Sequence, residues 1–284
     1  MAEAMMPAAP PIVTKPVPWH WWVTFDLFFA TMGGGLFSVA TILHLVGHPE
    51  EQAVARIAFL ITFPIMAVDL VCLVFDLGDP WRFMNMMRVF KPGSPMSVGV
   101  WTISIFSVLA FCAFVIVGLG LPIVLLSIVG IAGLPFALMV GIYKGVLFST
   151  TAQPGWRTMR WLGAFFSISA GLLGVAVALV IAAMSGLPAA ATTLRQSLLI
   201  MIVLYFGTVL LLERDADEWT RVARRHSRFS VWLAALGGIV IPLLVITFST
   251  GRLEEDCAAV LLIVGAIAIR HVLVFIPHRA TAEN

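Results

Sequence analysis

Long apolar stretches alternate along the chain with short polar ones, and eight of the apolar stretches separate clearly. A helix needs roughly 20 apolar residues to cross a bilayer, and backbone groups in lipid must be paired within the segment, so each stretch is expected to be a helix. The expected spans are Trp22–Leu45, Val54–Leu77, Ser97–Val117, Ile123–Phe148, Trp161–Met184, Ser197–Leu212, Phe229–Phe248 and Ala258–Ile276. The pattern therefore predicts an all-α integral membrane protein with eight transmembrane helices.

The order of the spans suggests how the chain is organised. An even number of crossings returns the chain to its starting side, so both termini are expected on one side of the membrane. We expect an N-terminal tail at 1–21, an eight-helix membrane domain at 22–277 and a C-terminal tail at 278–284. The membrane domain is expected to form two four-helix bundles, at about 22–148 and 161–277.

Composition excludes a soluble domain and several cofactors. Hydrophobic residues make up 61% of the 284 residues, charged residues 11%, and the mean hydropathy is +1.03, whereas soluble domains carry about 25% charged residues. The three cysteines lie far apart without a CxxC pair, so this chain is not expected to hold an iron–sulfur cluster. The histidines lie in or beside loops or on opposite sides, so we expect no haem, and no nucleic-acid partner is expected.

The basic residues are distributed unevenly between the two sides. Most lie on the side of the termini, in the tails and in loops 76–96, 149–160 and 213–228. The opposite side carries only Arg56, Arg195 and Arg252. The positive-inside rule places both termini in the cytoplasm of a bacterial-type inner membrane. A docking surface for an acidic partner would explain the same asymmetry. The charged run 213–228 is interpreted either as a solvated loop or as part of such a docking surface.

Ionisable residues within spans are costly in lipid and mark candidate sites. Asp26 lies roughly 6 Å into the first span, at 1.5 Å per residue. Tyr143 and Lys144 lie about five residues before the end of the fourth span, which runs the opposite way. The three residues are therefore expected at one depth, on the side of the termini.

Further polar residues suggest a proton path or ordinary packing. Asp69 and Asp76 are seven residues apart, so they share a helix face about 10 Å apart. Asp76 is otherwise expected to cap or pair with the following loop, and Asp69 to pair with a neighbouring helix. His44 shares the face of Asp26 at the other end of the span and is either a proton relay or a satisfied interfacial histidine.

Three other features have expectations of their own. The long side chain of Lys144 is expected to reach from within the span to the lipid headgroups. Arg270 and His271 are expected at the membrane interface. The glycines Gly33–Gly35 are expected to allow close helix packing, although Gly34 would also let a flat ligand approach the backbone.

The stretch Phe75–Trp101 is too specific in sequence for an ordinary loop, and it reads FDLGDPWRFMNMMRVFKPGSPMSVGVW. It resembles the NrfD/PsrC family of polysulfide reductase-type membrane subunits, whose pattern is approximately DLGRPxRFWN…F-x-P-x-SPMSxGxW. Asp79 departs from that pattern, where the family often has arginine. The run Asp26-Leu27-Phe28 with Gly33–Gly35, and the run Tyr143–Leu147 through Trp156, are similar to the family's first helix and fourth-helix end.

The resemblance implies the membrane anchor of a multi-subunit oxidoreductase. Such a subunit would exchange electrons between quinone (menaquinone or ubiquinone) and a docked ferredoxin-like iron–sulfur subunit, with coupled proton uptake or release. A molybdopterin enzyme or a multihaem cytochrome would complete the complex, which could also dimerise. The anchor itself would hold neither haem nor an iron–sulfur cluster.

The resemblance and the depth argument meet at the same residues. Asp26 is expected to accept quinol protons and Tyr143 to hydrogen-bond the other quinone oxygen, with Gly34 beside them. His20 is a second proton group or an interfacial histidine. The motif loop is expected to dock the iron–sulfur subunit through Arg82, Asn85, Ser94, Pro95 and Ser97.

Two other functional classes remain open at this point. A transporter or channel would line its path with Asp69 and Lys144, and discontinuous helices in both halves would support it. A purely structural anchor would tolerate replacement of Asp26 and Tyr143.

Overall fold

The structure, a computed structural model, describes residues 21–76, 80–150, 156, 159–215, 236–248 and 252–282. Every regular element in these ranges is helical, and seven helices are long and apolar enough to cross a membrane. They are α1 (Trp21–Val46), α2 (Pro49–Asp76), α4 (Pro95–Gly118), α5 (Ile123–Ser149), α6 (Leu162–Met184), α7 (Pro188–Asp215) and α11 (Arg252–Ala282). The all-α, multi-pass membrane architecture is therefore confirmed.

The expected span Phe229–Phe248 is described only from Leu236 onward. There it consists of a π-helical turn, η1 (Leu236–Val240), followed by α10 (Ile241–Phe248). Both pack against α11, and α10 also contacts α7. The described residues thus contain seven of the eight expected crossings. A short helix in the motif loop, α3 (Pro80–Met86), was not expected from the sequence.

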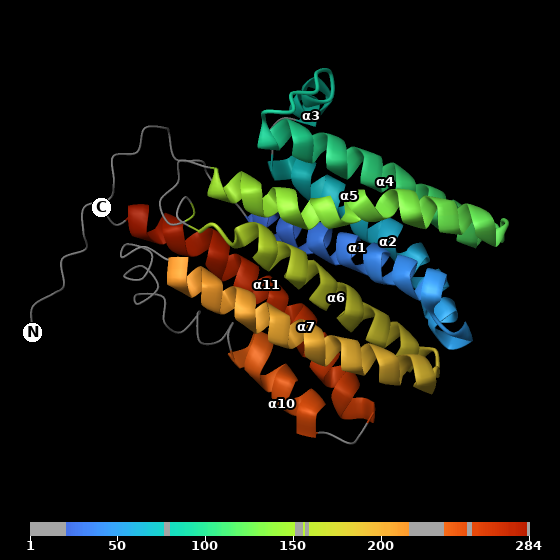
Figure 1. The fold of residues 1–284 in the computed structure, drawn as a ribbon. Helices are drawn as coiled ribbons and strands as arrows, with labels where there is room; N and C mark the ends of the chain where they lie inside the picture. Colours follow the sequence, from blue (N-terminus) through green and yellow to red (C-terminus); the bar gives the residue numbers. More distant parts are fainter. Residues whose placement is uncertain are drawn as a thin grey trace, which may run out of the picture.

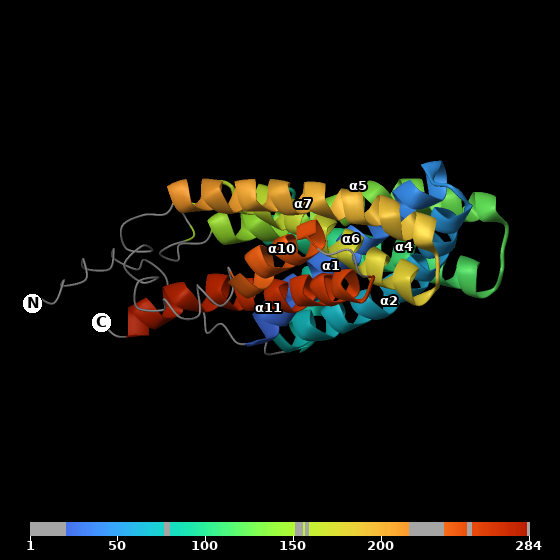
Figure 2. The same cartoon turned by 90° about the horizontal axis from the view of Figure 1, so that it is seen from below.

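The long helices lie side by side along a common direction (Figures 1 and 2), with α1 in the middle. Helix α1 packs against α2, α5, α6 and α11. Its apolar span is 72% buried within the protein, compared with 28% for the spans in α5 and α7. The start of α1 lies beside the later part of α11, where Trp21 stacks on His271 with ring centroids 4.2 Å apart.

Three consecutive glycines allow α1 to occupy this central place. A side chain at Gly33 would meet Met66 of α2, one at Gly34 would meet the carbonyl of Ala137 in α5, and one at Gly35 would meet the carbonyl of Ala170 in α6. Successive residues point about 100° apart around a helix, so each glycine faces a different neighbour. The expectation of close packing at these glycines is confirmed.

Helix ends extend beyond the apolar stretches that predicted them. Helix α7 begins at Pro188 rather than Ser197, and its first backbone amides, of Ala189 and Ala190, donate to the Glu50 carboxylate at 2.8 and 3.2 Å. An acidic side chain stabilises a helix N-terminus in this way. Helix α11 continues to Ala282, through residues that we expected to form the C-terminal tail.

The expected interfacial position of Arg270 is wrong. Its side chain is fully buried, and it donates to four oxygens on three helices. The acceptors are the carbonyls of Leu27 (3.3 Å) and Ala266 (3.0 Å) and the hydroxyls of Thr31 and Ser169 (both 2.7 Å). These acceptors replace the water that the guanidinium loses, which is why the cation can lie in the protein interior.

Candidate functional site

The site begins with a buried ion pair between α1 and α5. The ammonium of Lys144 donates to Oδ2 of Asp26 at 2.5 Å, and both residues are buried, with 2% and 6% of their surface exposed. The sequence placed these residues at one depth, and the structure brings them together. The expectation that Lys144 extends to the headgroups is wrong, because Asp26 offers the charge a partner within the protein.

Helix α2 adds a second buried acid beside this pair. Asp69 is fully buried and lies within electrostatic range of Asp26 and Lys144. By distance and angle, no described donor hydrogen-bonds to either oxygen of Asp69 or to Oδ1 of Asp26. The groups within reach of the Asp69 carboxyl include the Asp26 carboxyl and the Ala30 backbone. Cys72, one helical turn further along α2, is also buried within range of the same charges. The site therefore keeps three carboxylate oxygens able to accept a proton or a hydrogen bond.

Tyr143 is held beside the ion pair by a glycine in α4. Its ring lies against Gly99 so closely that a side chain at Gly99 would overlap the ring. The ammonium of Lys144 is 5.3 Å from the centroid of the same ring. Gly99 belongs to the SPMSVGVW motif, but sequence reasoning did not connect it with Tyr143, because the two lie on different helices.

Aromatic rings lie at the end of α1 that leads to the site. Trp22, one turn before Asp26, stacks on Phe75 of α2 with centroids 5.1 Å apart. Their exposed fractions are 42% and 58%. Such rings at a helix end are typical of the membrane interface, and here they connect α1 and α2 one turn before Asp26.

Several candidates lie apart from this group. His44 is eighteen residues from Asp26, roughly 27 Å along α1, and its Nε2 hydrogen-bonds the Ser127 hydroxyl at 3.0 Å. The space beside Gly34 is occupied by the backbone carbonyl of Ala137 in α5. Asp76 is the half-buried last residue of α2. His20 and the side chain of Arg82 lie outside what the structure describes, as does residue 216 onward of the 213–228 loop.

Much of the motif loop serves its own structure. Ser94 is the N-cap of α4 and accepts from the Ser97 amide at 3.4 Å, while Pro95 is the first helical residue. The Ser97 hydroxyl is buried and accepts from the Lys91 amide at 3.0 Å. Asn85, in α3, is exposed. Docking through these residues stays a prediction, and Asn85 is the most exposed of those whose side chains the structure describes.

The chemistry of the group fits a quinone head. A quinone has two oxygens that need donors, and a quinol has two protons that need acceptors. The Tyr143 hydroxyl and the Lys144 ammonium are donors. The unpartnered oxygens of Asp26 and Asp69 are acceptors. All of these residues lie toward the end of the protein that carries the motif loop.

Comparison with known proteins adds two findings. Residues 11–277 match the family described as polysulphide reductase, NrfD. The chain is also 21% identical to one of the subunits of the selenate reductase of Mesobacillus selenatarsenatis, in an alignment that covers 96% of this chain and 76% of that protein. Together the two matches extend over nearly all of the sequence.

Proposed function

The chain belongs to the polysulphide reductase NrfD family and is a membrane subunit of an oxidoreductase complex; we propose that its own task is to exchange electrons between the quinone pool and a docked iron–sulfur subunit. Proton uptake or release would accompany this exchange. The proposal rests on one observation above all. The buried Asp26–Lys144 pair lies beside Tyr143 and Asp69, and three oxygens of the two carboxyl groups accept no hydrogen bond from the described donors.

Each residue of the site has a proposed role. The quinone, when bound, supplies the two-electron chemistry, and the protein supplies binding, orientation and proton transfer. Oδ1 of Asp26 accepts a proton, while Lys144 holds the other oxygen and offsets the negative charge. Tyr143 donates a hydrogen bond. Asp69 takes the proton onward along α2 toward Asp76, two turns away on the same face.

The arrangement of the complex is proposed in the same way. The exposed part of the motif loop, with Asn85, docks a ferredoxin-like subunit, and a molybdopterin enzyme or multihaem cytochrome completes the electron path. The membrane domain forms two four-helix bundles with Phe229–Phe248 as the eighth crossing, and both termini face the cytoplasm of a bacterial-type inner membrane. Support for a multi-subunit partner comes from the relative, which is named as one subunit of a selenate reductase.

The first test uses the intact complex, purified through a tag on this chain. Reduced quinol is added, and iron–sulfur signals are recorded by electron paramagnetic resonance with and without a quinone-site inhibitor. We expect an inhibitor-sensitive change in the oxidation state of the clusters. If quinol leaves the clusters unchanged and quinone also fails to reoxidise the reduced complex, the proposed electron exchange is wrong.

Three variants separate catalysis from a purely structural ion pair. Asp26→Asn leaves Lys144 as an unpaired buried charge, which costs about 3–5 kcal/mol, so a loss of activity alone would be ambiguous. The double variant Asp26→Asn/Lys144→Gln removes both charges and is expected to assemble like the wild type. Its quinol-linked cluster reduction should nevertheless fall at least about 100-fold, because the proton acceptor is gone.

The outcome for the double variant is decisive for the role of Asp26. Wild-type cluster reduction in an assembled double variant would reject the catalytic role and favour a structural anchor. Lys144→Gln alone serves as the control, because it retains the Asp26 carboxylate while breaking the same ion pair.

A further inference from the structure

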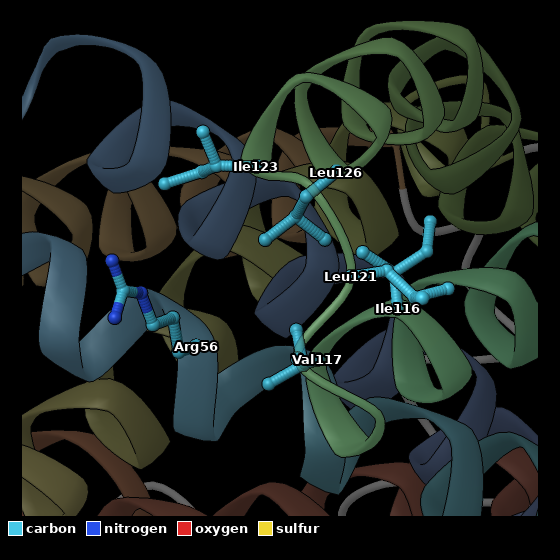
Figure 3. Close-up of a pocket in the computed structure, with 7 residues that line it drawn as sticks. Arg56, Ile116, Val117, Leu121, Ile123 and Leu126 are labelled. Carbon is cyan, nitrogen blue, oxygen red and sulfur yellow. The ribbon is translucent and has the colours of Figure 1, made fainter.

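A second polar feature lies at the opposite end of the helices from Asp26. There a hollow opens between α2, the end of α4 and the start of α5, and Figure 3 shows the Arg56 guanidinium on one side with aliphatic side chains on the other. The aliphatic lining residues are Ile116, Val117, Leu121, Ile123 and Leu126. One cation thus faces an otherwise apolar wall.

Arg56 is exposed and forms no ion pair with any residue that the structure describes. The two neighbouring carboxylates on α2 are engaged elsewhere. Glu50 accepts from the first amides of α7, and Glu51 accepts from the His48 amide at 2.8 Å. Arg56 is the one charged residue among the described residues that line the hollow, so the charge there is positive and accessible to an anionic ligand.

The side chain of Arg56 lies within reach of the lipid headgroups. Helix α2 has 28 residues and is about 42 Å long, so it exceeds a hydrocarbon core of about 30 Å at its ends. Arg56 lies about 10 Å from the start of α2 and is followed by the uncharged stretch 57–68. A long arginine side chain at this depth reaches the interface.

The surface around the hollow is exposed and apolar. The α4–α5 turn, Gly118–Pro122, has no charged residue. Leu119, Ile123 and Val124 around it are exposed by 72%, 51% and 58%. Exposed aliphatic groups at the end of a membrane-spanning hairpin favour contact with the bilayer, so we expect a ligand of the hollow to come from the membrane.

We propose that this hollow binds an anionic phospholipid, with the phosphate on Arg56 and an acyl chain along Val117 and Leu126. A guanidinium matches phosphate geometry through paired hydrogen bonds. A zwitterionic lipid would also need an acid for its cationic group, and the described residues that line the hollow include no acid. This site is independent of the quinone site, which lies at the other end of α1 and α5.

The test uses the full chain in nanodiscs that contain equal amounts of phosphatidylglycerol and phosphatidylcholine. Lipids that remain bound are counted by native mass spectrometry. The wild type is expected to retain phosphatidylglycerol preferentially, and Arg56→Gln to lower that retention about fivefold, the effect of one basic residue at a membrane surface. Arg195→Gln, which removes a charge from α7 on the same side, is the matched control and should leave retention unchanged.

A second variant tests the hollow itself. Val117→Trp fills the apolar wall while keeping Arg56, and it should lower phosphatidylglycerol retention to a similar extent. Equal retention of the two lipids by the wild type would overturn the proposal, as would unchanged retention in Arg56→Gln. A loss in Arg56→Gln without a loss in Val117→Trp would indicate surface attraction and would overturn the binding site. Thermal unfolding of each variant verifies that the fold is intact.

Discussion

The position of Tyr143 depends on the absence of a side chain on another helix. Gly99 in α4 leaves a gap, and the Tyr143 ring from α5 occupies it. The ring is thereby fixed beside Lys144, whose ammonium is 5.3 Å from its centroid. A ring held by packing needs no rearrangement when a ligand binds, so Gly99 acts as a positioning residue for the proposed quinone site.

Replacement of Gly99 by alanine should therefore impair the site without unfolding the helix. The added methyl group overlaps the Tyr143 ring, and a displacement of about 1 Å at a reacting group can cost up to about 100-fold in rate. We expect quinol-linked cluster reduction in Gly99→Ala to fall at least about tenfold, with the apparent KM for quinol raised. The measurement is a quinol titration of the assembled complex.

Gly93→Ala, two residues before the start of α4, is the control for this prediction. No described atom lies within 4 Å of a side chain at Gly93, so its activity should match the wild type. Wild-type KM and rate in Gly99→Ala would show that the position of Tyr143 is unimportant for turnover.

For single residues, the sequence predicted how deep a side chain lies in the membrane better than which residue it pairs with. Counting residues along two antiparallel spans was enough to place Asp26, Tyr143 and Lys144 together. It was not enough to show that Lys144 pairs with Asp26, because a lysine near a helix end has the same sequence pattern whether it extends to the headgroups or turns inward. That choice depends on where a neighbouring helix places its carboxylate.

Among the described spans, α1 is the most deeply buried, and its glycines determine how closely α2, α5 and α6 approach it. Gly35 approaches the Ala170 carbonyl of α6 most closely. Without a hydrophobic driving force between helices in lipid, close packing of this kind supplies much of the association energy. The α1–α6 contact should therefore be sensitive to a single methyl group.

We expect Gly35→Ala to lower the free energy of unfolding by roughly 1–3 kcal/mol, the usual cost of overpacking. The backbone carbonyl of Ala170 cannot rotate away as a side chain would. Gly207→Ala in α7 is the matched control, since no described atom lies within 4 Å of its added methyl group; it should stay within about 1 kcal/mol of wild type. Thermal unfolding in detergent measures both, and equal midpoints would contradict the prediction.

Helix existence was predicted well from hydropathy, and helix ends were not. The start of α7 illustrates the reason: residues 188–196 are too polar to be recognised as a span, but Glu50 from α2 caps their first amides. A cap supplied by another helix leaves no local signal in the sequence. The same limit applies to α3, whose seven residues are too few to show a helical period.

In the whole molecule, Arg270 joins the last helix to the first helix and to α6. Its guanidinium reaches Leu27 and Thr31 on α1 and Ser169 on α6. Leu27 is the residue after Asp26, so the two ends of the sequence meet next to the proposed quinone site. The sequence could not predict this, because an arginine near the end of an apolar span is ordinarily interfacial and only the tertiary arrangement provides its acceptors.

Two replacements of Arg270 separate its positive charge from its hydrogen-bonding geometry. Arg270→Lys keeps the buried charge, but an ammonium group with three donors cannot reach all four acceptors that the planar guanidinium group reaches. Each lost hydrogen bond to a charged group is worth about 1.5–3 kcal/mol, so a marked fall in the thermal midpoint is expected. Arg270→Met removes the charge together with its solvation cost and should be less destabilising than lysine. The reverse order, with lysine tolerated and methionine not, would mean that the protein needs the positive charge itself rather than the connections it makes.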